Sequence, residues 1–119
     1  MHDADTPLAV LSSRLAEFNA ARDWGRFHNP KDLATALAIE ASELLELFLW
    51  KPASHEPADW PARARLEAEC ADVLICLVNL ARTLGVDLMA AAEDKLAHNA
   101  DKYPVERARG SAKKYDELP

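Results

Sequence analysis

The sequence predicts an all-α protein with four helices, which form one domain over residues 1–119. Half of the residues are apolar and only three are glycine, a composition that favours helix and leaves little material for strands. In four stretches the apolar side chains recur three or four positions apart, which is the helical period. Capping residues or prolines separate these stretches. A chain of this length can bury one modest core.

The first helix is expected over residues 7–22. Thr6 can cap its free amide groups, and Pro7 suits the first helical position. Four apolar residues follow at helical spacing: Leu8, Leu11, Leu15 and Phe18. A loop over residues 22–28 comes next, where Gly25 breaks the pattern and two aromatic rings stand beside a histidine. Taken alone, such rings are best explained as a lid that folds back on the core.

The second helix is expected over residues 31–50, after an asparagine and a proline that repeat the cap-then-proline signal. One stripe runs along it at helical spacing: Leu33, Leu37, Glu40, Leu44 and Leu47. Glu40 therefore lies inside an otherwise apolar stripe, with Glu43 to one side of it. Glu46 lies further to the same side, either as an accessory ligand or as a solvated residue.

A connection with three prolines leads to the third helix, which is expected over residues 61–84. His55 in this connection has no partner at metal-ligand spacing and is expected on the surface. The third helix is apolar on most sides, so we expect a second subunit to cover it. Asn79 within this helix is then expected to make a buried polar contact across the interface.

Asp87 caps a fourth helix, which is expected over residues 87–102. Lys95 and Asn99 are four residues apart and therefore share one face of it. They would offer a cation and an amide to an anionic ligand if that face meets the site; otherwise they are solvated. The basic tail over residues 104–119 shows no periodic core pattern. We expect it either to be disordered or to lie over a neighbouring subunit.

Two acidic pairs carry the chemistry that the sequence indicates. Glu40-x-x-Glu43 lies in the second helix. Glu69-x-x-Asp72 lies in the third, and an apolar run begins directly after Asp72. Residues three apart on a helix are neighbours, so each pair presents two adjacent carboxylates. Two such pairs brought together in an apolar setting would repel each other unless a divalent cation lay between them. Oxygen ligands suit Mg²⁺, with Mn²⁺ as a substitute; the alternative is that the acids are solvated helix faces.

Charge and cysteine content restrict the partners and the compartment. A net charge of −6 disfavours a nucleic-acid polymer or an anionic membrane as the main partner, although a small anionic ligand can bind where a metal supplies positive charge. Cys70 and Cys76 form no C-x-x-C motif, which is typical of buried thiols in a reducing compartment. The first residues lack the pattern of a signal peptide, and no apolar run reaches the roughly 20 residues of a membrane span. We therefore expect a cytoplasmic protein.

The two acidic pairs and the stretches around them resemble the all-α nucleotide pyrophosphohydrolases of the MazG-like and dUTPase-like superfamily. The pairs fit the E-x-x-E…E-x-x-D motif of these enzymes. The resemblance extends over nearly the whole chain and is closest to the dCTP pyrophosphatase branch. The matching stretches are residues 18–28, 40–50, 72–75, 103–104 and 108–119.

The resemblance implies a four-helix bundle that assembles as a homodimer or a dimer of dimers. It also implies the reaction (d)NTP + H₂O → (d)NMP + pyrophosphate, which removes unwanted nucleotides from the pool. The metal ligands would be Glu40, Glu43, Glu69 and Asp72, with Mg²⁺ as the ion. Either Glu40 or Glu43 would take a proton from the attacking water. The alternative is a homo-oligomeric module that binds a nucleotide without hydrolysing it.

The resemblance further assigns side chains that would contact the nucleotide. The base pocket would be lined by Trp24, Phe27, His28 and Trp50, and the phosphates would lie near Lys95 and Asn99. Mammalian-type dCTP pyrophosphatases have a histidine where we align Leu15 and a tyrosine where we align Cys76. Cys76 is therefore a further candidate contact. The expected substrate is dCTP, a modified cytosine nucleotide or a broader set of (d)NTPs.

Overall fold

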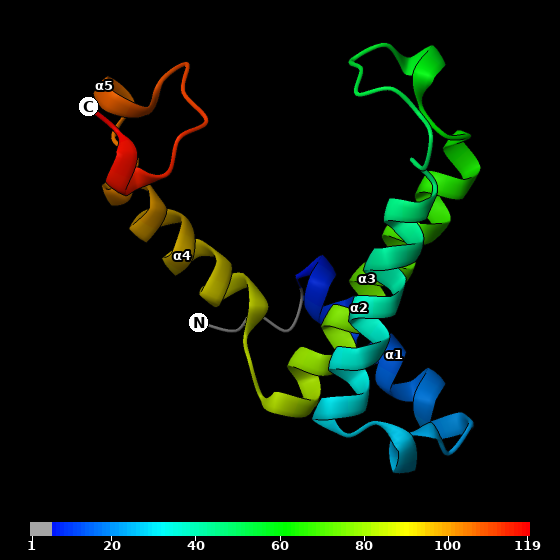
Figure 1. The fold of residues 1–119 in the computed structure, drawn as a ribbon. Helices are drawn as coiled ribbons and strands as arrows, with labels where there is room; N and C mark the ends of the chain where they lie inside the picture. The colour runs from blue at the N-terminus through cyan, green and yellow to red at the C-terminus, as the bar shows by residue number, and fades with distance from the viewer. Residues whose placement is uncertain (1–5) are drawn as a thin grey trace. The chain divides into compact units, whose positions relative to one another are not determined.

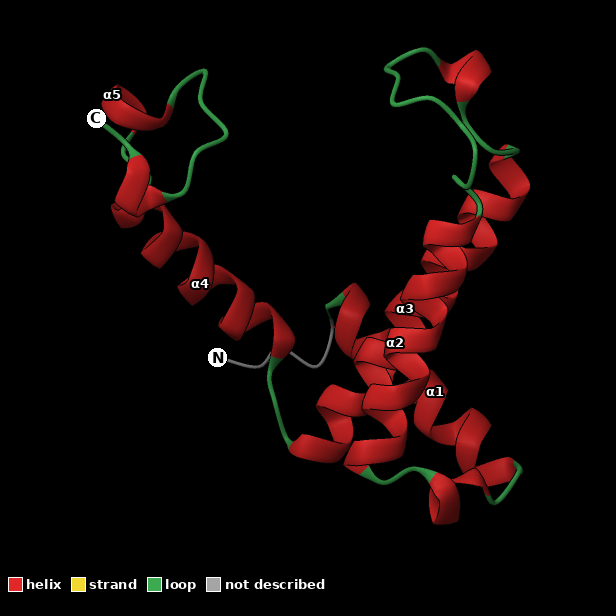
Figure 2. Cartoon of the chain, viewed as in Figure 1, coloured by secondary structure: helices red, strands yellow, loops and turns green. Residues whose placement is uncertain are grey.

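A computed structural model describes residues 6–119 of the chain (Figure 1). Every regular element in this range is helical (Figure 2), which confirms the predicted all-α class. The α-helices are α1 (Pro7–Ala21), α2 (Pro30–Glu46), α3 (Arg63–Leu84), α4 (Leu88–Lys102) and α5 (Val105–Ala108). Single 3₁₀ turns are η1 (Trp24–Phe27), η2 (Pro57–Asp59) and η3 (Tyr115–Glu117).

The predicted caps are present at three helix starts. The side chain of Thr6 accepts a hydrogen bond from the Ala9 amide, and the side chains of Asn29 and Asp87 do the same for the amides three residues on. Such bonds satisfy amides that have no partner within the helix, which is why these positions fix the starts. Gly85, with a φ of 70°, ends α3 in the left-handed conformation that glycine adopts without strain.

The predicted end of the second helix at residue 50 is wrong. Helix α2 ends at Glu46, and residues 47–50 form tighter turns. The amides of Leu47, Phe48 and Leu49 donate to carbonyls three residues back rather than four. Trp50 then takes a φ of 64°, which no α-helix continues. The apolar sequence period runs on through this turn, so periodicity alone cannot locate the stop.

The chain divides into two compact units, of which the first covers residues 6–86. In it α2 and α3 pack against each other along their lengths, and α1 packs on α3. Figure 1 shows α2 and α3 running side by side in opposite directions. The core of this unit is small and apolar, and its most buried members are Ala9, Leu15, Leu33, Val78 and Ala81. The pairing of α2 with α3 is what brings the two acidic pairs together.

A buried polar network joins α1 to α3. The Asn19 side-chain amide donates to Asn79 Oδ1 at 3.1 Å, and Arg82 Nη2 donates to the same oxygen at 2.9 Å. Arg82 Nη1 also donates to the Ser12 carbonyl at 3.1 Å, and burial lowers the pKa of this guanidinium. The predicted partner of Asn79 across a subunit interface is therefore wrong. Its partner lies on α1 of the same chain.

The second unit covers residues 87–119 and gives the basic tail a fold. Leu118 is buried, and the Arg107 guanidinium donates to the carbonyls of Leu118 and Pro119 at 3.0 and 2.6 Å. The Tyr115 ring lies edge-on to Tyr103, with 6.2 Å between centroids. The tail thus has an ordered fold in this structure, held by the buried Leu118 side chain and by the contacts of Arg107 and Tyr115.

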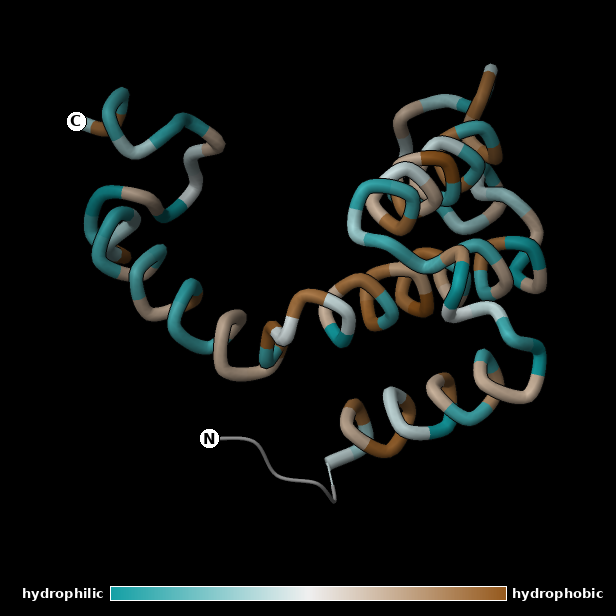
Figure 3. The backbone as a smooth tube through the Cα atoms, turned by 90° about the horizontal axis from the view of Figure 1, so that it is seen from below, coloured by the Kyte–Doolittle hydropathy of each residue, from teal (hydrophilic) through white to brown (hydrophobic). Residues whose placement is uncertain are grey.

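Several large apolar side chains of α2 and α3 remain exposed. Figure 3 shows apolar residues concentrated along α3 before its connection to α4. Those on the two helices include Ile39, Leu45, Leu74, Leu77 and Leu84, at 53, 73, 43, 36 and 54% exposure. One chain therefore leaves part of α3 uncovered, and its cover by a second subunit stays a prediction. No single helix in residues 6–119 has the length and hydropathy of a membrane span; α3 and α4 meet that test only when taken together across the break between them.

Candidate metal and nucleotide site

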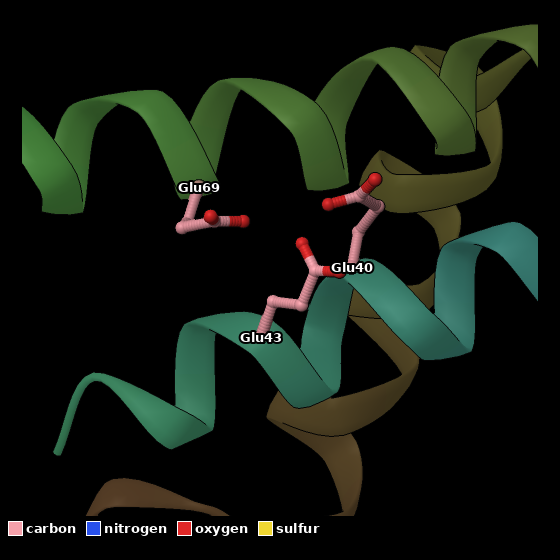
Figure 4. Close-up of side chains that lie close together, drawn as sticks. All are labelled: Glu40, Glu43 and Glu69. Atoms are coloured by element: carbon pink, nitrogen blue, oxygen red, sulfur yellow. The ribbon is translucent and has the colours of Figure 1, made fainter.

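Three carboxylates converge between α2 and α3. Glu40 and Glu43 come from α2 and Glu69 from α3, and Figure 4 shows all three in the space between the helices. One oxygen from each lies within 4.8 Å of the other two. Each residue is half-buried. A single cation placed among these oxygens would contact all three acids, as the paired spacing predicts.

Asp72, the predicted fourth acid, differs from the other three. It is exposed, and its oxygens are not among those that converge. Its charge nevertheless raises the pKa of Glu40 and Glu69, so it lies near the cluster. The role of Asp72 as a metal ligand stays a prediction.

The electrostatics of the cluster call for a positive charge. Glu40 Oε2 and Glu69 Oε2 are buried and have no hydrogen-bond partner among residues 6–119. The pKa of Glu40 rises from 4.5 to about 7. The main cause is a hydrogen bond to Glu43, which the protonated form of Glu40 can donate. Partial desolvation and the negative charges of Glu43, Asp72 and Glu69 raise the pKa further. Desolvation and the charges of Glu43 and Asp72 also raise the pKa of Glu69. An oxygen-only donor set with unpaired oxygens fits a hard divalent cation.

We predict that this repulsion makes the metal-free protein less stable as pH rises. The folded pKa of Glu40 (about 7) lies above its ordinary value of 4.5, so the folded state holds a proton that the unfolded state releases in this window. The contribution of Glu40 to the free energy of unfolding is fully present below pH 4.5 and is lost as pH rises through about 7. Urea unfolding with a chelator present measures this trend, and Glu40→Gln should flatten it. An equally steep loss of stability in Glu40→Gln would contradict the assignment to Glu40.

A cavity of about 280 Å³ opens beside the cluster. It is lined by Glu43, Glu46, Leu47, Arg65 and Glu69. Glu46 lines this cavity and is exposed, so both of its predicted alternatives, an accessory ligand and a solvated residue, stay open. Arg65 is absent from the sequence predictions, although it lies four residues before Glu69 and therefore on the same helical face. That spacing is the signal by which it could have been found.

Cys76 lies near the opposite end of the cluster. Burial raises the pKa of its thiol most, and the charges of Glu40 and Asp72 raise it further. Cys70, in contrast, is exposed. Cys76 therefore faces the acidic centre, where a nucleotide contact is predicted, and Cys70 is not the buried thiol that we expected.

The predicted base-pocket residues are brought together only in part. The Trp24 ring lies edge-on to Phe18 and to His28, with centroid distances of 5.6 and 6.4 Å. Phe27 and Trp50 are 62 and 93% exposed. A lid over the core would bury its rings, so that explanation is wrong. The exposed faces of these rings remain free to stack.

The left-handed backbone position of this loop is taken by an aspartate rather than by its glycine. Asp23, with a φ of 54°, takes the left-handed position, whereas Gly25 does not. The Asp23 carboxylate also pairs with Arg26 at 3.3 Å. Aspartate tolerates this backbone region better than most residues, so the turn needs no glycine.

Lys95 and Asn99 belong to the second compact unit, on α4. Lys95 is exposed and Asn99 is half-buried. Their predicted position near the phosphates stays a prediction.

The all-α fold and the paired-acid site define the class of protein. The sequence profile of the MazG-like family matches residues 35–118, and the chain belongs to this family. Mouse dCTP pyrophosphatase 1 is 50% identical over 107 residues, which cover 87% of this chain and 63% of the mouse protein. The human protein of the same name is 48% identical, with the same coverage. The chain therefore spans less than two thirds of the length of these relatives.

A solved structure shares the fold. The crystal structure of a pyrophosphatase from Archaeoglobus fulgidus aligns with a TM-score of 0.78 and 35% identity, over 87% of this chain and 98% of the archaeal one. The resemblance read from the sequence is thus confirmed at the level of family and fold.

Proposed function

We propose that this protein is a Mg²⁺-dependent nucleoside triphosphate pyrophosphohydrolase that converts a (d)NTP and water into a (d)NMP and pyrophosphate. The observation that carries the proposal is the convergence of Glu40, Glu43 and Glu69, two of which hold a buried, unpartnered oxygen. The names of its relatives, dCTP pyrophosphatase 1 and an archaeal pyrophosphatase, point to the same chemistry. The first of these names favours dCTP as substrate. We further propose a modified dCTP as an alternative substrate and nucleotide-pool sanitation as the role.

The residues that would hold the metal are Glu40, Glu43, Glu69 and Asp72. When bound there, Mg²⁺ would neutralise phosphate charge and favour departure of pyrophosphate. The oxygen of water attacks the α-phosphorus, the bond from that phosphorus to the bridging oxygen breaks, and pyrophosphate leaves. Glu40 or Glu43 accepts the proton of the water.

The nucleotide would lie between the ring cluster and the acids. Trp24, Phe27, His28 and Trp50 supply surfaces that can stack on a base. Cys76, near Glu40, would lie against the base or sugar, and Lys95 and Asn99 would contact the phosphates. With leucine at position 15 and a thiol at position 76, the pocket offers few polar groups to a cytosine. This chemistry extends the substrate range to modified cytosine nucleotides or other (d)NTPs.

The assembly that we propose is a homodimer or a dimer of dimers. The exposed apolar side chains of α2 and α3 support it, because a monomer gains nothing from leaving Leu45 or Leu74 in water. A second subunit would then complete the four-helix packing that a single compact unit lacks. A cytoplasmic location agrees with the free cysteines.

A nucleotide panel tests the proposal. Wild type with Mg²⁺ is expected to release pyrophosphate and monophosphate from at least one (d)NTP, and Asp72→Asn to release none. The fastest substrate then identifies the base. No turnover on any nucleotide, together with intact Mg²⁺-dependent binding, would favour a non-catalytic nucleotide-binding module instead.

A further inference from the structure

We propose that Arg65 binds the β- and γ-phosphates of the substrate, and hence the pyrophosphate that leaves. This inference rests on the proposed function and adds a specific residue to it. Neither the acidic motif nor the predicted phosphate contacts include this arginine.

Arg65 lies on the same face of α3 as the acidic residues, at one end of the cluster. Arg65, Glu69, Asp72 and Cys76 follow one another at intervals of four, three and four residues, so they lie along one helical face. Arg65 shares a cavity with Glu43, Glu46 and Glu69 at one end of the acidic cluster. Cys76 lies at the other end, where the charges of Glu40 and Asp72 raise its pKa. Arg65 and Cys76 are therefore about 16 Å apart along the axis of α3.

The ring cluster fixes which end receives the base. A cavity of about 260 Å³ is lined by Gly25 and His28 together with Arg82 and Thr83 of α3. The loop that carries Trp24 therefore lies toward the carboxyl end of α3, on the side of Cys76 and away from Arg65. A nucleotide with its base at the rings and its α-phosphate at the acids extends its remaining phosphates toward Arg65.

The guanidinium of Arg65 is available for such a contact. Within the described part of the chain it forms no ion pair or side-chain hydrogen bond, whereas Arg63 pairs with Glu67 at 2.9 Å. The other charged residues of its cavity are the acids Glu43, Glu46 and Glu69, which repel phosphate. A planar guanidinium can donate two parallel hydrogen bonds to phosphate oxygens. Arg65 is thus the group of this cavity that can recognise a diphosphate directly.

The affinity for pyrophosphate distinguishes a direct phosphate contact by Arg65 from a role in which Arg65 only balances the charge of the neighbouring acids. We would compare Arg65→Gln with Arg63→Gln, a control that removes a paired arginine two residues away. Calorimetry with Mg²⁺ and pyrophosphate gives affinity without turnover, and product inhibition compares pyrophosphate with nucleoside monophosphate. Arg65→Gln is expected to weaken pyrophosphate about tenfold or more and to raise KM for the triphosphate, since charge-assisted hydrogen bonds are lost. Inhibition by monophosphate should be unchanged, and Arg63→Gln should match wild type.

Two results would overturn the proposal. One is unchanged pyrophosphate affinity in Arg65→Gln with tighter Mg²⁺ binding, which would make Arg65 a counter-charge to the acids. The other is an equal loss of pyrophosphate and monophosphate affinity, which would indicate a general distortion of the site. Selective loss of pyrophosphate binding in a protein whose wild type hydrolyses no nucleotide would keep the Arg65 contact and reject the proposed function.

Discussion

Glu69→Gln is expected to abolish nucleotide hydrolysis and, at the same time, to raise the melting temperature of the metal-free protein. Glu69 brings a negative charge to within 4.8 Å of Glu40 and Glu43, and one of its oxygens is buried without a partner in the described part of the chain. Glutamine keeps the shape and removes the charge, so the repulsion falls. The same change removes a ligand, so we expect kcat to fall by at least about 100-fold, a loss that weaker perturbations of metal sites already reach.

A matched control separates these effects from general ones. Glu67→Gln makes the same chemical change two residues earlier on α3, at an exposed side chain whose one ion pair within residues 6–119 is with Arg63. Exposed pairs contribute little to stability, so this variant should keep both the activity and the metal-free melting temperature of wild type. Mg²⁺ should stabilise wild type and Glu67→Gln but not Glu69→Gln. A Glu69→Gln variant that melts lower and keeps its activity would contradict a repulsive metal-binding cluster.

Asn79→Ala is expected to destabilise the first unit by about 2 kcal/mol or more, because it leaves buried donors without an acceptor. Asn79 Oδ1 accepts from both Asn19 and Arg82, and Asn19 and Asn79 are only 6 and 7% exposed. Water cannot readily replace the lost acceptor at such burial. Urea unfolding at constant m value measures the change in the free energy of unfolding.

The double variant Asn19→Ala/Asn79→Ala tests the network itself. Removing both amides also removes the orphaned donor of Asn19, so the double change should cost less than the sum of the single ones. Asn79→Asp is a further comparison, since it keeps the acceptor for Arg82 and adds a charge of opposite sign. Strictly additive losses would mean that Asn19 and Asn79 stabilise the fold independently.

The helices and the acidic pairs could be predicted because local rules determine them. Caps at Thr6, Asn29 and Asp87 act within one turn, and residues three apart share a helical face whatever surrounds them. The stop of α2 at Glu46 could not be predicted, because the apolar period continues through Leu47 and the turn depends on three-residue hydrogen bonds. Local pattern gives the elements; it does not give their last turn.

The features that the sequence left unpredicted depend on contacts between distant segments. From the sequence, Asn79 is expected at a subunit interface. Its partner in the structure is Asn19 of α1, sixty residues away in sequence. From the sequence alone, Arg65 is indistinguishable from an ordinary surface arginine. Only the packing of α2 against α3 shows that it shares a cavity with Glu43 and Glu46. The exposure of Asp72 likewise depends on how α2 and α3 pack rather than on the apolar run beside it. Whether a side chain is buried depends on how the helices pack, so the pattern of a single helix cannot predict it.

The most direct test of the central claim is hydrolysis in ¹⁸O-labelled water, with the products separated and weighed by mass spectrometry. Attack on the α-phosphorus at the acidic cluster predicts that the label enters the nucleoside monophosphate and that pyrophosphate stays unlabelled. Glu69→Gln should form no labelled monophosphate and no pyrophosphate, and Glu67→Gln should behave as wild type. Label in pyrophosphate, or release of orthophosphate in its place, would show that a different bond breaks and would contradict the proposed reaction.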